Sequence, residues 1–326
     1  MTRDLCRSRL LVLVLAGALV AAACGGDDDD GEASGGEESA GGETAAECPD
    51  GDSVLMAMPY EANQPAGENW RLGVEMAVAE INADGGILGC QIELDPQDTQ
   101  GDPDVSRQVV ADQAEEDPYA FLGTVFSAST IVNMVEAQRA EIPMFVGAEA
   151  PSITNREENG DNDFIYRSSF GVDTAADKFV SYIVDQGVES VDVIYKNDEF
   201  GAGGREAYVA AFDEAGIDVG LDIQVQPDQT DQSAEVAQLA GGDADAIFVF
   251  MTEIETAAFL DEYQAQGLDK PLYGGDVLSA ASTIALVQPG AADGTTTHAG
   301  LNASAPVFED WKQAYAEFHP DADPPD

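Results

Sequence analysis

The sequence has very little positive charge. Its 326 residues hold 13 Lys plus Arg against 63 Asp plus Glu, a formal net charge of −50. Nucleic-acid binding depends on clustered Lys and Arg beside the phosphates, so this balance argues against a nucleic-acid partner. It argues equally against adhesion to anionic lipid through a basic patch.

The sequence patterns of catalysis and metal binding are also missing. Two histidines, His298 and His319, leave little room for a histidine-rich metal site or a Ser-His-Asp triad. No C-x-x-C pair, H-E-x-x-H motif, Walker phosphate loop or G-x-S-x-G nucleophile elbow occurs. We therefore predict a protein that is not an enzyme and that has no metal or cofactor.

The excess of acid over base has two interpretations. It keeps the chain soluble but makes the folded protein repel itself. Under the first interpretation the protein works in high salt, where screening relieves the repulsion. Under the second, the acidic surface arose by compositional drift without a selected role.

The N-terminus is typical of an exported protein. Three arginines precede residues 10–23, a run of 14 apolar or small residues. A membrane-spanning helix needs about 20 residues, so the run fits the central region of a secretory signal peptide better. We predict that residues 1–23 are a signal peptide.

Residues 20–24 (VAAAC) resemble the bacterial lipoprotein signal, in which cleavage falls just before a Cys that then carries lipid. The match departs at Ala21, where Leu is usual. We predict lipidation of Cys24 and anchoring to the outer face of the cell membrane. Ordinary secretion with a spare Cys is the alternative. Residues 24–50 have no basic residue and are rich in Gly, Ser and acid, which predicts a disordered, extended linker.

Two cysteines remain in the exported chain, Cys48 and Cys90. Each lies just before an apolar run that we expect to be a strand, residues 53–58 and residues 91–94. In a parallel βαβ unit the starts of neighbouring strands meet at one edge, and export places the thiols in an oxidising compartment. We predict a Cys48–Cys90 disulfide, with two free buried thiols as the alternative.

The body of the chain alternates helical and strand patterns. Val74, Ala77, Val78 and Ile81 follow the i, i+3, i+4, i+7 spacing of one helix face. The same spacing recurs at Ala176–Ile183, Tyr208–Ala215 and Thr256–Tyr263, each followed by Gly. Short apolar runs predict strands at residues 119–125, 144–146, 191–195 and 246–251.

Alternating strands and helices imply parallel sheets with right-handed crossovers. The number of elements exceeds one small sheet, so the fold class is α/β with two doubly wound parallel-sheet lobes joined by a hinge. We expect lobe 1 at residues 51–168, lobe 2 at residues 169–296 and a return to lobe 1 at residues 297–326. The crossovers are expected near residues 167–171 and 295–303.

Two helix starts attract attention as ligand sites. Residues 123–130 (GTVFSAST) run from a predicted strand into a predicted helix, and amides and hydroxyls at such a start bind carboxylates well. Simple N-capping by Ser127 or Ser129 is the alternative. The second start, residues 201–204 (GAGG), lacks the last Gly of a dinucleotide fingerprint, and we interpret it as a helix-start turn.

Residues 73–89 (GVEMAVAEINADGGILG) resemble the G-x-x-x-A-x-x-x-I-N-x-x-G-G-I-x-G segment of the leucine/isoleucine/valine-binding protein family. Residues 95–99 (DPQDT) resemble an acidic turn that follows the second strand in that family. The resemblance runs from about residue 53 to the C-terminus. It implies the type I periplasmic-binding fold and a solute-binding protein of an ABC importer.

The resemblance also implies a binding site between two hinged lobes. It places the carboxylate of an amino-acid ligand on Ser127 and on backbone groups of Ala148 and Ala150. It places an aromatic ligand wall at Phe200 and the partner of the ligand ammonium at Asp276. Packing at a helix start is the alternative role of Phe200, and capping that of Asp276.

This sequence departs from the family at three site positions. A threonine beside the carboxylate appears as Ala150 or its neighbour Glu149, a first-lobe aromatic as Ala66, and a second-lobe tyrosine aligns near Thr252. Amino-acid binding is therefore expected without an assured preference for branched chains. The family continues beyond the position of residue 326, so we expect C-terminal elements of lobe 1 to be missing here.

These inferences converge on an extracytoplasmic, lipid-anchored solute-binding protein. We expect it to capture an amino acid or a related small polar ligand by hinge closure and to deliver it to an ABC permease. The alternative function is a sensory receptor module of the same fold that signals to a membrane partner.

Overall fold

A computed structural model describes residues 48, 53–155, 163–300, 302 and 304–322 of the chain. The signal peptide, Cys24 and nearly all of the predicted linker lie outside the described residues. Contacts group residues 45–326 into one compact unit, and both sheets of the protein belong to it.

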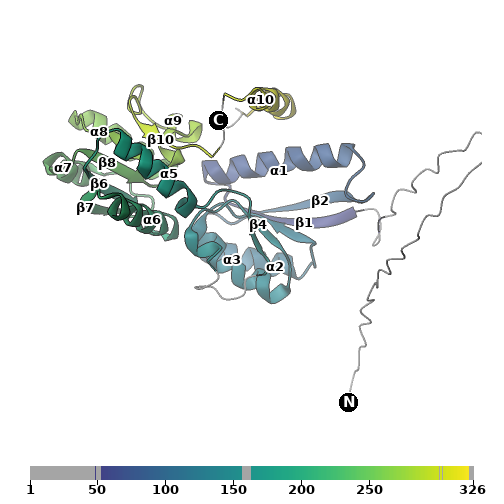
Figure 1. Ribbon diagram of the computed structural model, residues 1–326. Helices are drawn as coiled ribbons and strands as arrows, with labels where there is room; N and C mark the ends of the chain where they lie inside the picture. The colour runs from purple at the N-terminus through teal and green to yellow at the C-terminus, as the bar shows by residue number, and fades with distance from the viewer. Residues whose placement is uncertain (1–47, 49–52, 156–162, 301, 303, 323–326) are drawn as a thin grey trace, which may run out of the picture. The chain divides into compact units, whose positions relative to one another are not determined.

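The first sheet is parallel and has the strand order β2-β1-β3-β4-β5. Its strands, given in chain order, are β1 (Ser53–Tyr60), β2 (Gln91–Asp98), β3 (Ala120–Leu122), β4 (Met144–Val146) and β5 (Ile165–Arg167). Helix α1 lies on one face of the sheet, and α2 and α3 lie on the other (Figure 1). These helices are α1 (Pro65–Ala83), α2 (Pro103–Ala114) and α3 (Ser127–Ala140).

The second sheet is also parallel and has the order β10-β9-β8-β6-β7. Its strands are β6 (Ser190–Lys196), β7 (Asp218–Val225), β8 (Ala246–Phe250), β9 (Leu272–Gly274) and β10 (Thr296–Thr297). Its helices are α5 (Val172–Asp185), α6 (Glu199–Ala215), α7 (Ser233–Gly241), α8 (Glu253–Gln266) and α9 (Ala281–Ile284). The chain leaves the first sheet after Arg167, near the predicted crossover, although the exact lobe bounds stay a prediction.

Strand β8 shows that the second sheet is buried on both faces. Phe248 and Phe250 pack with α5 and α6, whereas Ile247 and Val249 pack with α7 and α8. Successive side chains of a strand point to opposite faces, so a strand covered twice must be apolar throughout. All five residues of β8 are buried, as the continuous apolar run predicted.

The predicted faces of α5, α6 and α8 are buried, apart from Ala215 at the end of α6. Ala176, Phe179, Val180 and Ile183 of α5 are all buried, as are Tyr208, Ala211 and Phe212 of α6. The predicted face of α1 is wrong: Ala77 is exposed and Ile81 is 39% exposed, whereas Met76 is buried, so α1 packs on a different face from the one that the apolar spacing indicated. The two-lobed, doubly wound α/β fold class predicted from the sequence is confirmed. Beyond the second sheet, α10 (Pro306–Phe318) contacts α1, and the His319 ring lies 2.9 Å from the Leu72 carbonyl oxygen.

One expectation about the second strand is wrong. Residues 95–98 do not form a turn, because β2 continues to Asp98 and pairs with β1 along its whole length. Strand β2 is an edge strand, so Pro96 need not donate a backbone hydrogen bond on its free side. The turn begins instead at Thr99, whose carbonyl accepts from the Asp102 amide at 3.1 Å.

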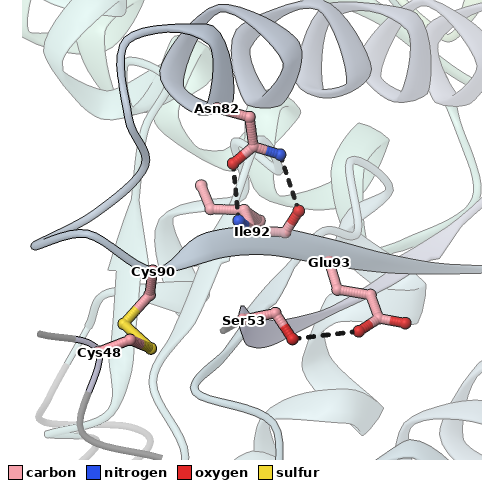
Figure 2. The surroundings of a disulfide bond; sticks show 6 residues. All are labelled: Cys48, Ser53, Asn82, Cys90, Ile92 and Glu93. Atoms are coloured by element: carbon pink, nitrogen blue, oxygen red, sulfur yellow. Dashed lines mark hydrogen bonds between the residues drawn. A yellow bond between two sulfur atoms is a disulfide. The ribbon is translucent and has the colours of Figure 1, made fainter. Parts of the chain in front are cut away.

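A disulfide joins Cys48 to Cys90, with an S–S distance of 2.06 Å (Figure 2). Cys90 directly precedes β2, so the bond ties the chain ahead of β1 to the start of its neighbour. Close by, the Asn82 side chain at the end of α1 accepts from the Ile92 amide at 2.7 Å and donates to the Ile92 carbonyl at 2.9 Å (Figure 2). Covalent and polar contacts together fix this edge of the first sheet.

Candidate functional site

A cavity of about 520 Å³ is lined by residues that follow strands of both sheets. Lys196 ends β6, Gly147 follows β4, Thr252 follows β8, and Asp276 comes soon after β9. These positions lie at or just beyond the carboxyl ends of parallel strands. Ligands of open α/β sheets bind outside those ends, so the topology marks this cavity as the candidate site.

The first-sheet side of the cavity contains the start of helix α3. Ser127, Ala128 and Ser129 line the cavity, and the N-cap residue Phe126 provides no side-chain capping bond. N-capping by Ser127 or Ser129 is therefore not observed. The first amides of a helix have no acceptor inside the helix and attract negative charge. This end of the cavity can bind a carboxylate.

The two serines of this helix start differ in their hydrogen bonding. The Ser127 hydroxyl accepts from the Ala150 amide at 3.2 Å. The Ser129 hydroxyl is buried and has no hydrogen-bond partner within the described parts of the chain. A buried polar group without a partner costs free energy, which makes Ser129 a candidate contact for a polar ligand atom.

A hidden carboxyl group stands behind the same helix start. Glu61 follows β1 and is fully buried, and its oxygens lie 3.4 Å from the Phe126 amide and 3.5 Å from the Val125 amide. Burial raises the pKa of Glu61 to about 7, against the opposing effect of the two amides. Glu61 does not line the cavity, so it supports the loop ahead of α3 rather than a ligand.

An apolar wall completes the first-sheet side. Trp70 of α1 lines the cavity, and its indole nitrogen donates to the Leu122 carbonyl at 3.2 Å. A Cβ atom built on Gly147 would lie 2.9 Å from the Trp70 ring, so glycine makes room for the indole. Ala66 stands where the resemblance places an aromatic residue, and it also lines the cavity. Trp70, one helical turn later, is an aromatic residue of the cavity that the sequence analysis did not identify.

The second-sheet side of the cavity contains a buried lysine that the sequence interpretation missed. The Lys196 ammonium donates to the Thr252 hydroxyl at 2.9 Å and pairs with Glu255 at 3.2 Å and Asp198 at 3.4 Å. It lies 6.0 Å from the centre of the Phe126 ring. Thr252, a predicted ligand residue, lines the cavity, and its hydroxyl is engaged with Lys196 and Glu255.

Besides Asp198, four carboxyl groups line the cavity: Glu149, Asp228, Glu253 and Asp276. The Asp276 carboxylate accepts from the Val277 amide at 3.0 Å, inside a short 3-10 helix, Asp276–Ser279. Burial raises the pKa of Asp276 and of Glu253. Burial, together with the nearby Asp276 charge, raises the pKa of Glu149 to about 9. A cationic ligand group would relieve this concentration of acid.

Phe200 also lines the cavity and has a packing role as well. Its ring stacks on Phe250 with centroids 4.5 Å apart. Phe200 belongs to the first turn of α6, where the Asp198 carboxylate caps the helix by accepting from the Gly201 amide at 2.9 Å. Helix α6 begins at Glu199, so residues 201–204 lie inside its first turns, two residues later than the predicted helix start. Both interpretations of Phe200 therefore fit its position.

The structure brings together four of the six predicted ligand residues. Ser127, Phe200, Thr252 and Asp276 line one cavity. The side chains of Ala148 and Ala150 are buried in the core of the first sheet, and neither residue lines the cavity. Glu149, which lies between them, does. No local pattern in the sequence could have identified Lys196 and Glu253 as cavity residues.

The described residues also bear on two other kinds of site. They contain no group of three or more His, Cys, Asp or Glu side chains arranged to hold a metal ion. Within the same residues, no helix combines the length and the apolar character needed to cross a membrane.

Comparison with known proteins gives one family. Residues 60–326 match the family model described as periplasmic binding protein. A curated relative, Leu/Ile/Val-binding protein homolog 7 of Brucella suis biovar 1, is 26% identical over 245 residues. That alignment covers 68% of this chain and 58% of the relative. The chain therefore spans less than two thirds of the length of that relative.

Solved structures share the fold at low sequence identity. The branched-chain amino acid substrate-binding protein LivJ of Streptococcus pneumoniae, solved with isoleucine, has a TM-score of 0.73 at 20% identity, covering 84% of this chain and 79% of LivJ. A solute-binding protein of R. palustris, solved with benzoate, has a TM-score of 0.75 at 18% identity, covering 84% and 76%. One fold thus accommodates chemically different ligands, and fold similarity alone does not name the ligand of this chain.

Proposed function

Because the chain belongs to the periplasmic binding protein family, and its curated relative is a leucine/isoleucine/valine-binding protein homologue, we propose that it captures an amino acid for an ABC importer. The ligand would bind in the cavity between the α3 helix start and the second-sheet carboxyl groups. A permease in the membrane would then receive it. The protein would act by binding alone, without catalysis.

One observation carries this proposal: the two sides of the cavity have opposite chemical character. The α3 helix start offers Ser127 and Ser129 for a carboxylate, and Asp276 on the opposite side offers a carboxylate for an ammonium group. A zwitterion satisfies both sides at once only when it bridges them. A ligand that binds a closed form better than an open form shifts the protein toward closure.

A thermal-shift screen of the purified chain tests the amino-acid proposal. A ligand present at about 100 times its Kd should stabilise the fold by about 2.7 kcal/mol. For any amino acid that gives a shift, the matched controls are its amino alcohol, which lacks the carboxylate, and its deaminated acid, which lacks the ammonium. Both controls should bind more weakly. A cooperative melt with no shift from any amino acid would contradict the proposal.

We further propose that the exported chain is anchored through lipid on Cys24, with residues 24–50 as a flexible tether. Several acyl chains are needed for firm attachment, because a single chain binds only marginally. Mass spectrometry of the N-terminal peptide should find cleavage before Cys24 and added lipid mass. Cys24→Ala should move the protein from the membrane fraction to the soluble fraction. An unmodified Cys24 would overturn this part.

A further inference from the structure

The walls of the cavity carry far more acid than base. Among the lining residues there is one cationic side chain, Lys196. The acidic lining residues are Glu149, Asp198, Asp228, Glu253 and Asp276. A zwitterionic ligand adds no net charge, so it would leave this surplus in place.

The charge of Lys196 is already balanced. Its ammonium pairs with Asp198 at 3.4 Å and with Glu255 at 3.2 Å, and both partners are carboxylates. Lys196 is 7% exposed and Glu255 is fully buried, so the group is shielded from solvent. Little positive charge remains for the other acids of the lining, which are Glu149, Asp228, Glu253 and Asp276.

The Glu149 side chain has no hydrogen-bond or ion-pair partner among the residues that the structure describes. Arg167, at the end of β5, is close enough to act on it electrostatically, but the guanidinium donates to the Thr154 hydroxyl at 3.0 Å and to two backbone oxygens. The two backbone acceptors are the Glu149 carbonyl at 3.2 Å and the Ala150 carbonyl at 2.7 Å. Glu149 therefore faces the cavity as a carboxyl group still available to a ligand.

The second acid, Glu253, is also buried at the edge of the cavity. It lies in the first turn of α8, is 4% exposed and lines the cavity. In the described residues, no other residue donates a hydrogen bond to its carboxyl group. Its own backbone amide is the donor that it has, so a ligand cation would stabilise the ionised form of this buried carboxyl group.

The remaining titratable groups around the cavity do not supply a second cation. His298, which follows β10, donates to or accepts from the Tyr208 hydroxyl of α6 at 2.7 Å. Burial lowers the pKa of His298, which favours its neutral form. Arg167 also interacts with Asp173 at the start of α5, which offsets part of its charge. Lys196 of β6 is paired as described above.

We infer that the ligand carries two cationic nitrogen groups, one for Asp276 and one for Glu149, as a basic amino acid does. This inference rests on the proposed amino-acid function and narrows its substrate class. The carboxylate of such a ligand would bind the α3 helix start, as for any amino acid. Glu149 thereby becomes the residue that sets specificity.

Ligand binding should release a proton. In the free protein the raised pKa of Glu149, about 9, keeps its carboxyl group mostly protonated at pH 7. A ligand cation favours the ionised form, so Glu149 would ionise on binding. Affinity for the dicationic ligand should then rise with pH from 6 to about 8.

Isothermal titration of the purified chain with L-lysine, L-ornithine, cadaverine and L-leucine tests the inference. L-lysine or L-ornithine should bind at least about tenfold tighter than L-leucine, the size of one charge-assisted hydrogen bond. Titrations at pH 7.5 in buffers of different ionisation enthalpy should detect proton release with lysine and less with leucine. These measurements need no variant, so they stand even if a substitution disturbs folding.

Glu149→Gln then tests the residue itself. Glutamine resembles the protonated side chain but cannot ionise, so the ratio of lysine to leucine affinity should fall at least about tenfold. Glu214→Gln, on an exposed site of α6 outside the cavity lining, is the matched control and should leave the ratio unchanged. An equal loss of both affinities would mean that Glu149 and Asp276 share one ammonium, which would overturn the inference.

The outcomes separate this inference from the proposed function. If leucine binds as tightly as lysine in the unaltered protein, the two-cation inference fails and amino-acid capture stands. If none of the amino acids binds, the proposed function itself fails. Tight binding of cadaverine, which has no carboxylate, would support the second cation site and remove the role assigned to the helix start.

Discussion

The two sides of the cavity are suited to ligand groups of opposite charge. On the first-sheet side, the α3 helix start and Trp70 present serines, helix amides and an indole, and we call this part of the lining the neutral wall. The buried acid behind it, Glu61, does not line the cavity, so Glu149, which follows β4, is the one acid that the first-sheet side presents. The second-sheet side presents Lys196, Glu253 and Asp276 directly. A neutral wall with a helix start attracts an anion, whereas a charged wall with surplus acid attracts a cation. Specificity therefore depends mainly on the second side and on Glu149.

The largest expected effect concerns the acid hidden behind the neutral wall. The folded pKa of Glu61 is raised to about 7 from 4.5, so its protonated form stabilises the fold at pH 5 and that stability is lost as pH rises through 7. Relative to Glu61→Gln, the unaltered protein should lose about 2 to 3 kcal/mol of unfolding free energy between pH 5 and pH 8.5. Urea melts of both proteins across this range measure the difference. Parallel curves would contradict it.

The next effect tests the charged wall. Asp276→Asn removes the carboxylate proposed for the ligand ammonium but keeps its shape. Affinity for any bound amino acid should fall about 10- to 100-fold, the usual value of a hydrogen bond to a charged group. Isothermal titration measures the loss, with Glu214→Gln as control. Unchanged affinity would remove Asp276 from the site and break the contrast between the walls.

A smaller effect tests the neutral wall. Ser129→Ala removes a buried hydroxyl that has no partner in the described part of the chain. The free protein should be as stable as before or slightly more stable, while ligand affinity falls about two- to tenfold. Melting curves without ligand and titrations with ligand should therefore change in opposite directions. A loss of stability in the free protein would indicate a structural role instead.

The smallest effect concerns charge that belongs to neither wall. With a net charge of −50, the protein should gain stability when salt screens its self-repulsion. We expect the Tm to rise by about 2 to 4 °C, equivalent to about 1 kcal/mol, between 0.1 M and 1 M KCl. Differential scanning calorimetry measures it. A flat or falling Tm would favour compositional drift over adaptation to high salt.

The fold was predictable because buried helix faces and buried strands have recognisable spacings of apolar residues in the sequence. The helix face at Ala176–Ile183 and the apolar run of β8 report burial directly. Strand β7 and the second half of β2 were missed, because both are edge strands with many polar side chains. Edge strands contact one neighbour and solvent, so their sequences carry a weaker signal.

The site was predictable only where a family pattern marked it. Asp276 and Ser127 were found through resemblance, and both line the cavity. Lys196 ends an apolar strand, and its burial depends on Glu255 and Thr252, far along the chain. Glu149 was noticed only as a departure. The excess of acidic over basic residues around the cavity arises only when distant parts of the chain come together, so no single stretch of sequence reveals it.

The Cys48–Cys90 disulfide has a mechanical consequence. It fastens the chain ahead of β1 to the residue that precedes β2, and those strands pair along eight residues. A pull on the chain from the N-terminal side of Cys48 is thus shared by two strands. Tension cannot peel β1 from β2 one hydrogen bond at a time. The disulfide therefore protects the β1–β2 pairing from force applied to the N-terminal part of the chain.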